Sequence, residues 1–221
     1  MSLATKSPMP RKVIPYPGPF PIHINARAVN KEPFKLELNT VWEIMENYLS
    51  LIARMYNLKI HSFVLMPNHF HLLLSPSENN LGGALNYFMR ETSKEIGRNA
   101  GRVNQVYGGR AYKTVITTER HFRIAYKYVY RNPVKANLCQ KVEEYDYSTL
   151  AFLVGRTRRA IPLEQDTQLF CPDFSENTLN WLNTSPAMKN ETEVKLALRR
   201  RIFKLPKDDS KVPSSLESEP F

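Results

Sequence analysis

Cysteine is scarce in this 221-residue chain, which excludes two classes of small stabilised protein. Cys139 and Cys171 lie 32 positions apart, and neither belongs to a CxxC pair. A cysteine-based zinc site and a disulfide scaffold both need more cysteines, or closer ones. The two isolated cysteines fit a reducing compartment, so we expect a cytoplasmic protein.

Long apolar runs are also missing. The longest candidate, residues 63–74, is interrupted by Pro67-Asn68 and by two histidines, whereas a membrane span needs about 20 apolar residues. Residues 1–21 contain six prolines and no apolar core of the secretory type, so we expect no signal peptide and no membrane contact. A hydrophobic fraction of 42% is nevertheless enough for a packed core, which excludes global disorder.

Acidic side chains are rare in the middle of the chain. The net charge is +10, and residues 81–138 contain 11 basic side chains against three acidic ones. Residues 139–221, in contrast, are nearly balanced, with 12 basic and 13 acidic side chains. A concentrated basic stretch with interleaved tyrosines favours a polyanionic partner over an ordinary solvated surface.

Hydrophobic periodicity predicts an α+β fold. Alternation indicates strands at residues 20–29, 59–66, 69–75 and 111–117, and helical spacing indicates helices at 40–58, 81–100 and 118–131. Thr40 and Thr118 are the expected N-caps, and Asn132-Pro133 is expected to stop the third helix. The order β-α-β-β-α-β plus a helix predicts a ferredoxin-like, four-stranded antiparallel sheet with two helices on one face.

The chain is expected to have three parts. Residues 1–19 contain five prolines and predict an extended arm, and residues 20–155 form the predicted domain. Residues 156–221 form a C-terminal extension that is partly helical and then disordered. Within it, residues 190–193 resemble a capping box that opens a helix through Phe203, and the tail beyond Pro206 is expected to be disordered.

Two histidines on the third predicted strand are candidate metal ligands. His69 and His71 are two positions apart, so both rings project from one face of the sheet, about 6–7 Å apart at Cα. Phe70, Leu72 and Leu74 then point to the other face, toward the helices. On spacing alone, two half-buried histidines with ordinary hydrogen bonds are the commoner explanation.

The sequence around these histidines resembles a known family. Residues 65–74, LMPNHFHLLL, resemble the His-hydrophobic-His signature of the HUH endonucleases. In particular, they resemble that of the REP-associated tyrosine transposases and the related single-tyrosine, IS200-like transposases. Residues 128–138, in which a tyrosine is followed four positions later by Asn and then Pro-Val, resemble the second family motif. Residues 145–149 are a looser match to the aromatic-Ser-Ser stretch that usually follows, and the resemblance covers residues 15–155.

This resemblance implies an activity and the residues that carry it. Such enzymes cut single-stranded DNA with a tyrosine, here Tyr128, which forms a 5′-phosphotyrosine and leaves a free 3′-OH. His69, His71 and Asn132 are then expected to hold a divalent metal, Mg or Mn, and the substrate is expected to be single-stranded or hairpin DNA. The long C-terminal region is closer to the REP-associated members, which favours a monomer over a dimer.

Helix geometry separates the three tyrosines of the third predicted helix. Tyr126 lies on an apolar stripe, which indicates a core position. Tyr130 has Val134 four residues later, which offers no ligand. Tyr128 has Asn132 at i+4, so the hydroxyl and the amide share one face of the helix.

Further polar residues are candidates for accessory roles. His121 is an accessory candidate, and His23 on the first predicted strand is a further candidate for the DNA side. His61 is expected to have no direct role. The run 199–201 either contacts DNA or solvates a helix end. The expected phosphate-contacting set is Arg90, Lys94, Arg98, Arg102, Arg110, Lys113, Arg131 and Lys135.

Two other functions compete with the transposase hypothesis. One is a non-catalytic protein that binds hairpin DNA, although both histidines, the tyrosine and the asparagine are intact. The other is an RNA-binding module, since ferredoxin-like sheets often bind RNA. The fourth predicted strand, RAYKTV at residues 110–115, lacks the aromatic pattern that such modules carry.

Overall fold

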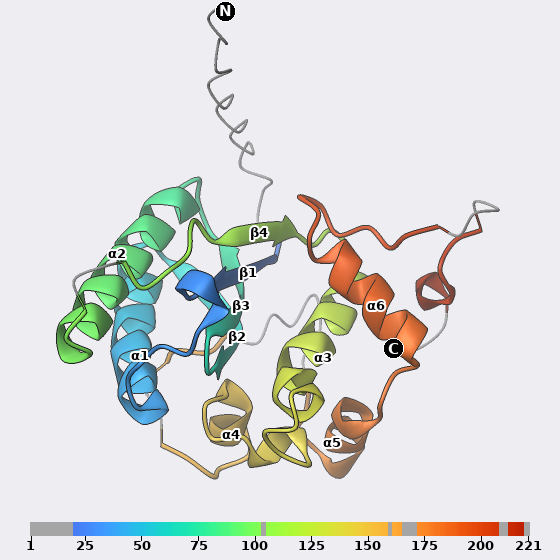
Figure 1. The fold of residues 1–221 in the computed structure, drawn as a ribbon. Helices are drawn as coiled ribbons and strands as arrows, with labels where there is room; N and C mark the ends of the chain where they lie inside the picture. The colour runs from blue at the N-terminus through green and yellow to red at the C-terminus, as the bar shows by residue number, and fades with distance from the viewer. Residues whose placement is uncertain (1–19, 103–104, 159–160, 165–171, 208–211, 219–221) are drawn as a thin grey trace, which may run out of the picture.

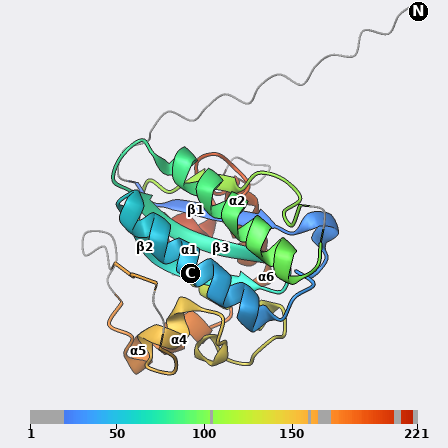
Figure 2. The same cartoon turned by 90° about the vertical axis from the view of Figure 1, so that its left-hand side faces the viewer.

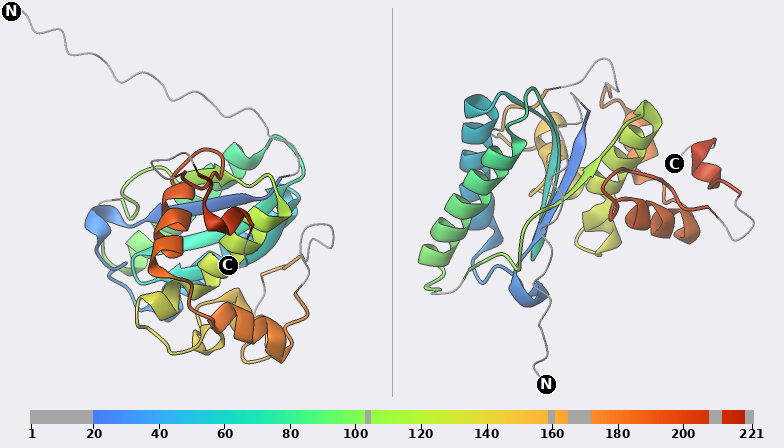
Figure 3. Two further views of the ribbon diagram at one scale, coloured as in Figure 1. Left: turned by 90° about the vertical axis from the view of Figure 1, so that its right-hand side faces the viewer. Right: turned by 90° about the horizontal axis from the view of Figure 1, so that it is seen from above.

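The computed structural model describes residues 20–102, 105–158, 161–164, 172–207 and 212–218. Four strands form one antiparallel sheet in the order β2-β3-β1-β4, with bounds β1 (Ile22–Arg27), β2 (Leu58–Met66), β3 (His69–Pro76) and β4 (Tyr112–Val115). Helices α1 (Leu38–Met55) and α2 (Leu81–Asn99) cover one face, and α3 (Glu119–Lys135) lies on the other (Figures 1, 2 and 3). This arrangement is the predicted ferredoxin-like fold.

Alternation along β1 and β3 gives the sheet two different faces. The face toward α1 and α2 is apolar, and its buried core includes Ile22, Ile24, Phe70, Leu72 and Leu74. The intervening residues point to the α3 side. In the register of the two strands, Asn25 pairs with His71 and Arg27 with His69, so polar side chains of neighbouring strands come together on that face.

Helix α3 is longer than predicted. It continues through Pro133 to Lys135, whereas Asn132-Pro133 was expected to end it. A proline removes one backbone hydrogen bond and crowds the carbonyl four residues earlier, but Pro133 lies only two residues before the end of α3 and does not break it. The chain leaves the helix at Asn137, whose φ of 56° is left-handed. Because the helix is unbroken, Tyr128 and Asn132 lie one turn apart on it.

One predicted helix cap is confirmed and the other is wrong. The Thr118 hydroxyl accepts a hydrogen bond from the backbone N–H of His121 at 3.1 Å, as an N-cap should. Helix α1 instead begins at Leu38, so Thr40 lies inside its first turn.

Both edges of the sheet are covered by chain from the C-terminal half. Along β2, the N–H of Leu65 donates to the carbonyl of Tyr147 at 2.9 Å. Along β4, the N–H of Val115 donates to the carbonyl of Arg201, and the N–H of Phe203 donates back to Val115, both at 2.8 Å. These contacts satisfy part of each edge strand within the chain itself.

The C-terminal region packs against the domain more than its sequence predicts. It contains α5 (Glu176–Asn183), α6 (Met188–Ala197) and the 3-10 helix η3 (Ser215–Glu217). The preceding domain also contains the helix α4 (Thr149–Leu153) and the 3-10 helices η1 (Val29–Lys31) and η2 (Val142–Glu144). Helix α5 was not predicted, and α6 ends before Phe203 because the following residues pair with β4.

The tail beyond Pro206 differs in part from the expected disorder. Leu216 in η3 is fully buried, and the hydroxyl of Ser214 donates to the carboxylate of Glu193 on α6. The predicted arm at 1–19 and the tail residues 208–211 and 219–221 lie outside the described residues. No helix in the described part of the chain is long and apolar enough to cross a membrane.

Candidate active site

A cavity of about 1140 Å³ lies beside the polar face of the sheet. Strands β1 and β3 line it with His23, Asn25, His69 and His71, and α3 lines it with Tyr128, Asn132 and Lys135. Its other walls include Arg27 and Lys31, residues 108–110, Tyr112, and residues at and just after the end of α6. The structure therefore brings together the predicted nucleophile and all three predicted metal ligands.

Tyr128 is the tyrosine of α3 that faces this cavity. Its ring stands perpendicular to the ring of His71, with centroids 5.8 Å apart, and 6.5 Å from the ring of His23. Tyr126 and Tyr130 are buried in the core instead, with their rings 4.8 Å apart, and the Tyr130 hydroxyl lies 2.9 Å from Oγ1 of Thr149. The structure thus separates the three tyrosines as the helix geometry predicted.

The hydroxyl of Tyr128 keeps its proton at neutral pH. Burial raises its pKa above the usual value of 10, and the positive charges of Arg199 and Arg27 oppose this rise. Attack by this oxygen on an electrophile therefore requires loss of the proton during the reaction.

Asn68, in the turn before β3, orients the ring of His69 through hydrogen bonds. The amide nitrogen of Asn68 donates to the carbonyl of Lys31 at 2.5 Å, so its Oδ1 faces Nδ1 of His69 at 2.6 Å. Because an amide oxygen only accepts, Nδ1 of His69 carries the hydrogen, and Nε2 keeps its lone pair. This is the tautomer in which Nε2 binds a metal.

His71 has one ring nitrogen paired and the other bare. Its Nδ1 lies 2.9 Å from Nε2 of His23, and the two rings stack with centroids 5.2 Å apart. Its Nε2 is buried and has no hydrogen-bond partner among the described residues. A buried polar atom is rarely left unpaired, so this nitrogen fits a ligand in the cavity.

The three clustered histidines are neutral at physiological pH. Burial lowers the pKa of His23 to about 3. Burial, with the charge of Arg27 adding to it, lowers the pKa of His69 to about 4, and burial lowers that of His71 well below its usual value. Neutral imidazole is the form that binds a metal, so no proton has to leave first.

Asn132 supplies the remaining candidate ligand. Its amide nitrogen donates to the carbonyl of Tyr128 at 2.7 Å, which leaves Oδ1 as the atom able to bind a cation. In the described part of the chain, no three or more His, Cys, Asp or Glu side chains form a metal site. The candidate set is thus two imidazoles and one amide, from His69, His71 and Asn132.

Positive charge surrounds the cavity. None of the described residues lining it carries a carboxylate, whereas six are basic: Arg27, Lys31, Arg110, Lys135, Lys195 and Arg199. Two of the eight predicted phosphate contacts, Arg110 and Lys135, belong to this lining. Lys135 also forms an ion pair with Glu191 of α6.

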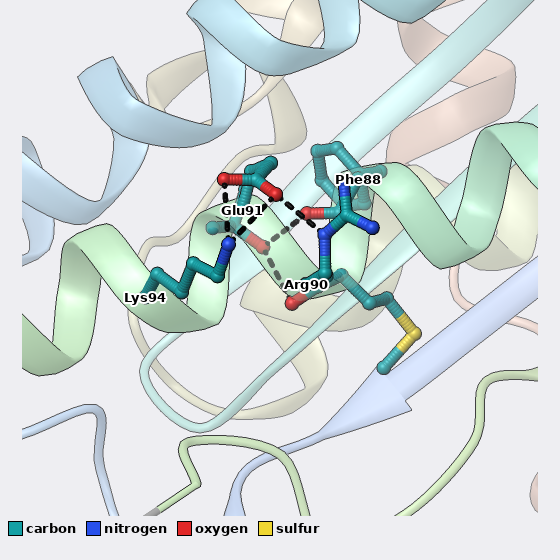
Figure 4. A network of polar contacts seen from close by, with 6 residues as sticks. Phe88, Arg90, Glu91 and Lys94 are labelled. Atoms are coloured by element: carbon teal, nitrogen blue, oxygen red, sulfur yellow. Dashed lines mark hydrogen bonds and ion pairs between the residues drawn. The ribbon is translucent and has the colours of Figure 1, made fainter. Parts of the chain in front are cut away.

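Most of the other predicted phosphate contacts lie away from the cavity. Arg90, Lys94 and Arg98 are on α2, which covers the opposite face of the sheet, and the first two pair with Glu91 (Figure 4). Lys113 pairs in register with Ile24 and so shares the face toward α1 and α2. Arg102 follows α2 and does not line the cavity.

Arg131 and His121 differ from their expected roles. The guanidinium of Arg131 is buried and donates to the carbonyls of Leu182 and Asn183, at 3.1 and 2.5 Å, so it holds the end of α5 rather than facing the cavity. Nε2 of His121 lies 3.1 Å from the carboxylate of Glu217, and its ring is not part of the lining.

Both ring nitrogens of His61, which was expected to have no direct role, contact groups of the protein. Its Nε2 lies 2.8 Å from the hydroxyl of Ser75, and its Nδ1 lies 3.0 Å from the carbonyl of Glu164.

Sequence reasoning missed Arg27, Lys31 and Lys195. The sequence contained a signal for Arg27. His23, Asn25 and Arg27 occupy every second position of β1, so their side chains lie on the same face of the sheet. Lys195 had no such signal, since it reaches the cavity only through packing of α6 far along the chain.

Comparison with known proteins identifies a family and solved structures of similar fold. A family model described as "Transposase IS200 like" matches residues 22–132, half of the chain, and its span includes all four candidate site residues. None of the curated proteins matches. A solved structure of a REP-associated tyrosine transposase bound to a REP hairpin is similar in fold, with a TM-score of 0.55 and 17% sequence identity. The similarity covers 76% of this chain and 100% of that one.

Proposed function

Because this chain belongs to the family of IS200-like transposases, we propose that it cuts and rejoins single-stranded DNA through Tyr128, at hairpin-forming repeats. One observation carries the proposal. The Tyr128 ring lies 5.8 Å from that of His71, in a cavity that six basic side chains and no described carboxylate line. A nucleophile, candidate metal ligands and a site for a polyanion thus occur together.

The reaction exchanges one phosphodiester for another. The phenolic oxygen of Tyr128 forms a bond to phosphorus as the bond from phosphorus to the 3′ oxygen breaks. The phenol loses its proton, and the leaving 3′ oxygen takes one up. The 5′ phosphate stays on Tyr128, so the bond energy is conserved and the strand can be joined to a 3′-OH elsewhere.

The histidine pair and the amide fit a divalent cation, Mg or Mn. His69 and His71 would hold it through Nε2 and Asn132 through Oδ1. When bound, the cation polarises the scissile phosphate and neutralises charge that develops on it. Imidazole ligands favour Mn²⁺ over the harder Mg²⁺.

The walls of the cavity support a single-stranded substrate. Basic side chains would pair with phosphates, and Tyr112, 60% exposed at the cavity wall, offers a ring on which an unpaired base can stack. The neighbour of similar fold is bound to a REP hairpin, which supports hairpin DNA as the partner here.

A monomer is the proposed catalytic unit. Tyr128, the histidines and Asn132 meet within a single chain, so no second copy has to supply the nucleophile.

A cleavage assay tests this function against its two rivals. A labelled DNA hairpin with single-stranded flanks is incubated with the protein in Mn²⁺ or in EDTA and run on a denaturing gel. We expect a shortened strand and a slow covalent adduct with Mn²⁺, and neither with EDTA. Binding without an adduct would instead indicate a hairpin-binding protein, and a strong preference for the matching RNA would indicate an RNA-binding module.

A further inference from the structure

The C-terminal segment reaches the cavity from outside the family's shared region. The family model ends at residue 132, yet Lys195, Leu198 and Arg199 line the same cavity as Tyr128. We propose that Lys195 and Arg199 bind the phosphate backbone of the DNA strand next to Tyr128. This inference rests on the proposed function and assigns part of the DNA site to the extension.

Residues 194–203 pack against α3 and form hydrogen bonds with strand β4. The Thr114 hydroxyl, on β4, contacts the carbonyls of Leu198 and Arg200, both at 2.8 Å, and the N–H of Val115 donates to the carbonyl of Arg201. Val194, Ala197 and Leu198 are buried in the core that also contains α3. In Figures 1 and 3, α6 lies beside α3 and the chain that follows it reaches β4. The backbone that carries Lys195 and Arg199 is therefore anchored before DNA binds.

Only part of the basic run faces the cavity. Arg199 lines it, whereas Arg200 and Arg201 do not, although all three side chains are exposed. The backbone contacts of 198–203 with β4 explain this division, since they fix the direction of successive residues. The sequence allowed two roles for this run, contact with DNA or solvation of a helix end. The position of Arg199 in the cavity favours the first role, whereas Arg200 and Arg201 lie outside the cavity.

The charges of Lys195 and Arg199 are free to act on a ligand. No described carboxylate lies within ion-pair distance of either side chain. Arg199 also lies near enough to Tyr128 to oppose the rise in the pKa of its phenol. A DNA phosphate next to the nucleophile would therefore meet an uncompensated guanidinium.

Two double variants test the inference with equal loss of charge. Lys195→Gln with Arg199→Gln removes the cavity pair, and Arg200→Gln with Arg201→Gln removes the neighbouring pair. Binding of a fluorescent hairpin with single-stranded flanks is measured in EDTA from 0.05 to 0.5 M salt, with circular dichroism as the folding control. The loss of two phosphate contacts should reduce the magnitude of the slope of log K against log salt by about 1.4. This change corresponds to an affinity about 25-fold lower at 0.1 M salt.

The expected result is this loss in the cavity pair and a change of less than about threefold in the neighbouring pair. Equal losses in both pairs would overturn the inference, because charge alone and not position would then matter. An unchanged cavity pair, with a wild-type protein that binds DNA and forms the adduct, would overturn this inference alone. A wild-type protein that does not bind the DNA would overturn the proposed function as well.

Discussion

Acid is expected to weaken this fold through His23. The side chain is 3% exposed, and burial lowers its pKa from 6.5 to about 3. Below pH 6.5 the unfolded chain therefore binds a proton at this position and the folded chain does not. The stability that the neutral ring contributes is present in full above pH 6.5 and is lost progressively toward pH 3.

The size of the effect follows from the gap between the two pKa values. Each pH unit below 6.5 removes about 1.4 kcal/mol from the free energy of unfolding, so His23 alone removes about 2 kcal/mol at pH 5. His69 and His71 act in the same direction, since burial lowers their pKa values too. The site that keeps these imidazoles neutral thus makes the protein sensitive to acid.

Urea unfolding at pH 7 and pH 5 isolates the contribution of His23. The wild-type protein is compared with His23→Gln, whose amide oxygen can still accept a hydrogen bond from His71, and EDTA removes any effect of bound metal. We expect the variant to lose about 2 kcal/mol less than the wild type between the two pH values. An equal loss in the two proteins would refute the buried, neutral state of His23.

Three further predictions concern the residues around the cavity. Asn132→Ala should lower metal affinity, so that raising Mn²⁺ partly restores the covalent adduct, as measured on denaturing gels; an adduct that excess Mn²⁺ does not restore would contradict the ligand role. His71→Ala should abolish the adduct while hairpin affinity, measured by fluorescence anisotropy, stays within about threefold; full cleavage in Mn²⁺ would remove the metal assignment. Tyr130→Phe should lose the contact with Thr149 and about 1 kcal/mol of stability in urea unfolding, yet still form the adduct.

The fold was predictable where short-range patterns decide it. Alternation separated the two faces of β1 and β3, and the apolar stripe on α3 identified Tyr126 as a core residue. The face shared by Tyr128 and Asn132 also followed from their spacing, although the helix was expected to end at residue 131, just before Asn132. That error arose because a proline near a helix end removes only one hydrogen bond.

Contacts between distant segments could not be predicted in this way. Nothing near Arg131 in the sequence indicates that the carbonyls at the end of α5, some 50 positions later, accept from its guanidinium. Residues 201–203 pair with β4 in place of the predicted end of the helix, and Arg199, which precedes them, lines the cavity. The charge count located a basic stretch, but its residues lie on both sides of the sheet. Arg90 and Lys94 are on α2, which covers the face opposite the cavity.

Mass spectrometry of the peptide linked to DNA tests the central claim most directly. The adduct formed on a labelled hairpin is digested with trypsin and nuclease, and the modified tyrosine is identified in the wild type and in Tyr128→Phe. The structure predicts a phosphotyrosine at residue 128 and no adduct in the variant, which keeps its ring and loses only the attacking oxygen. A phosphotyrosine at residue 126 or 130, or an adduct that persists in Tyr128→Phe, would contradict the proposed active site.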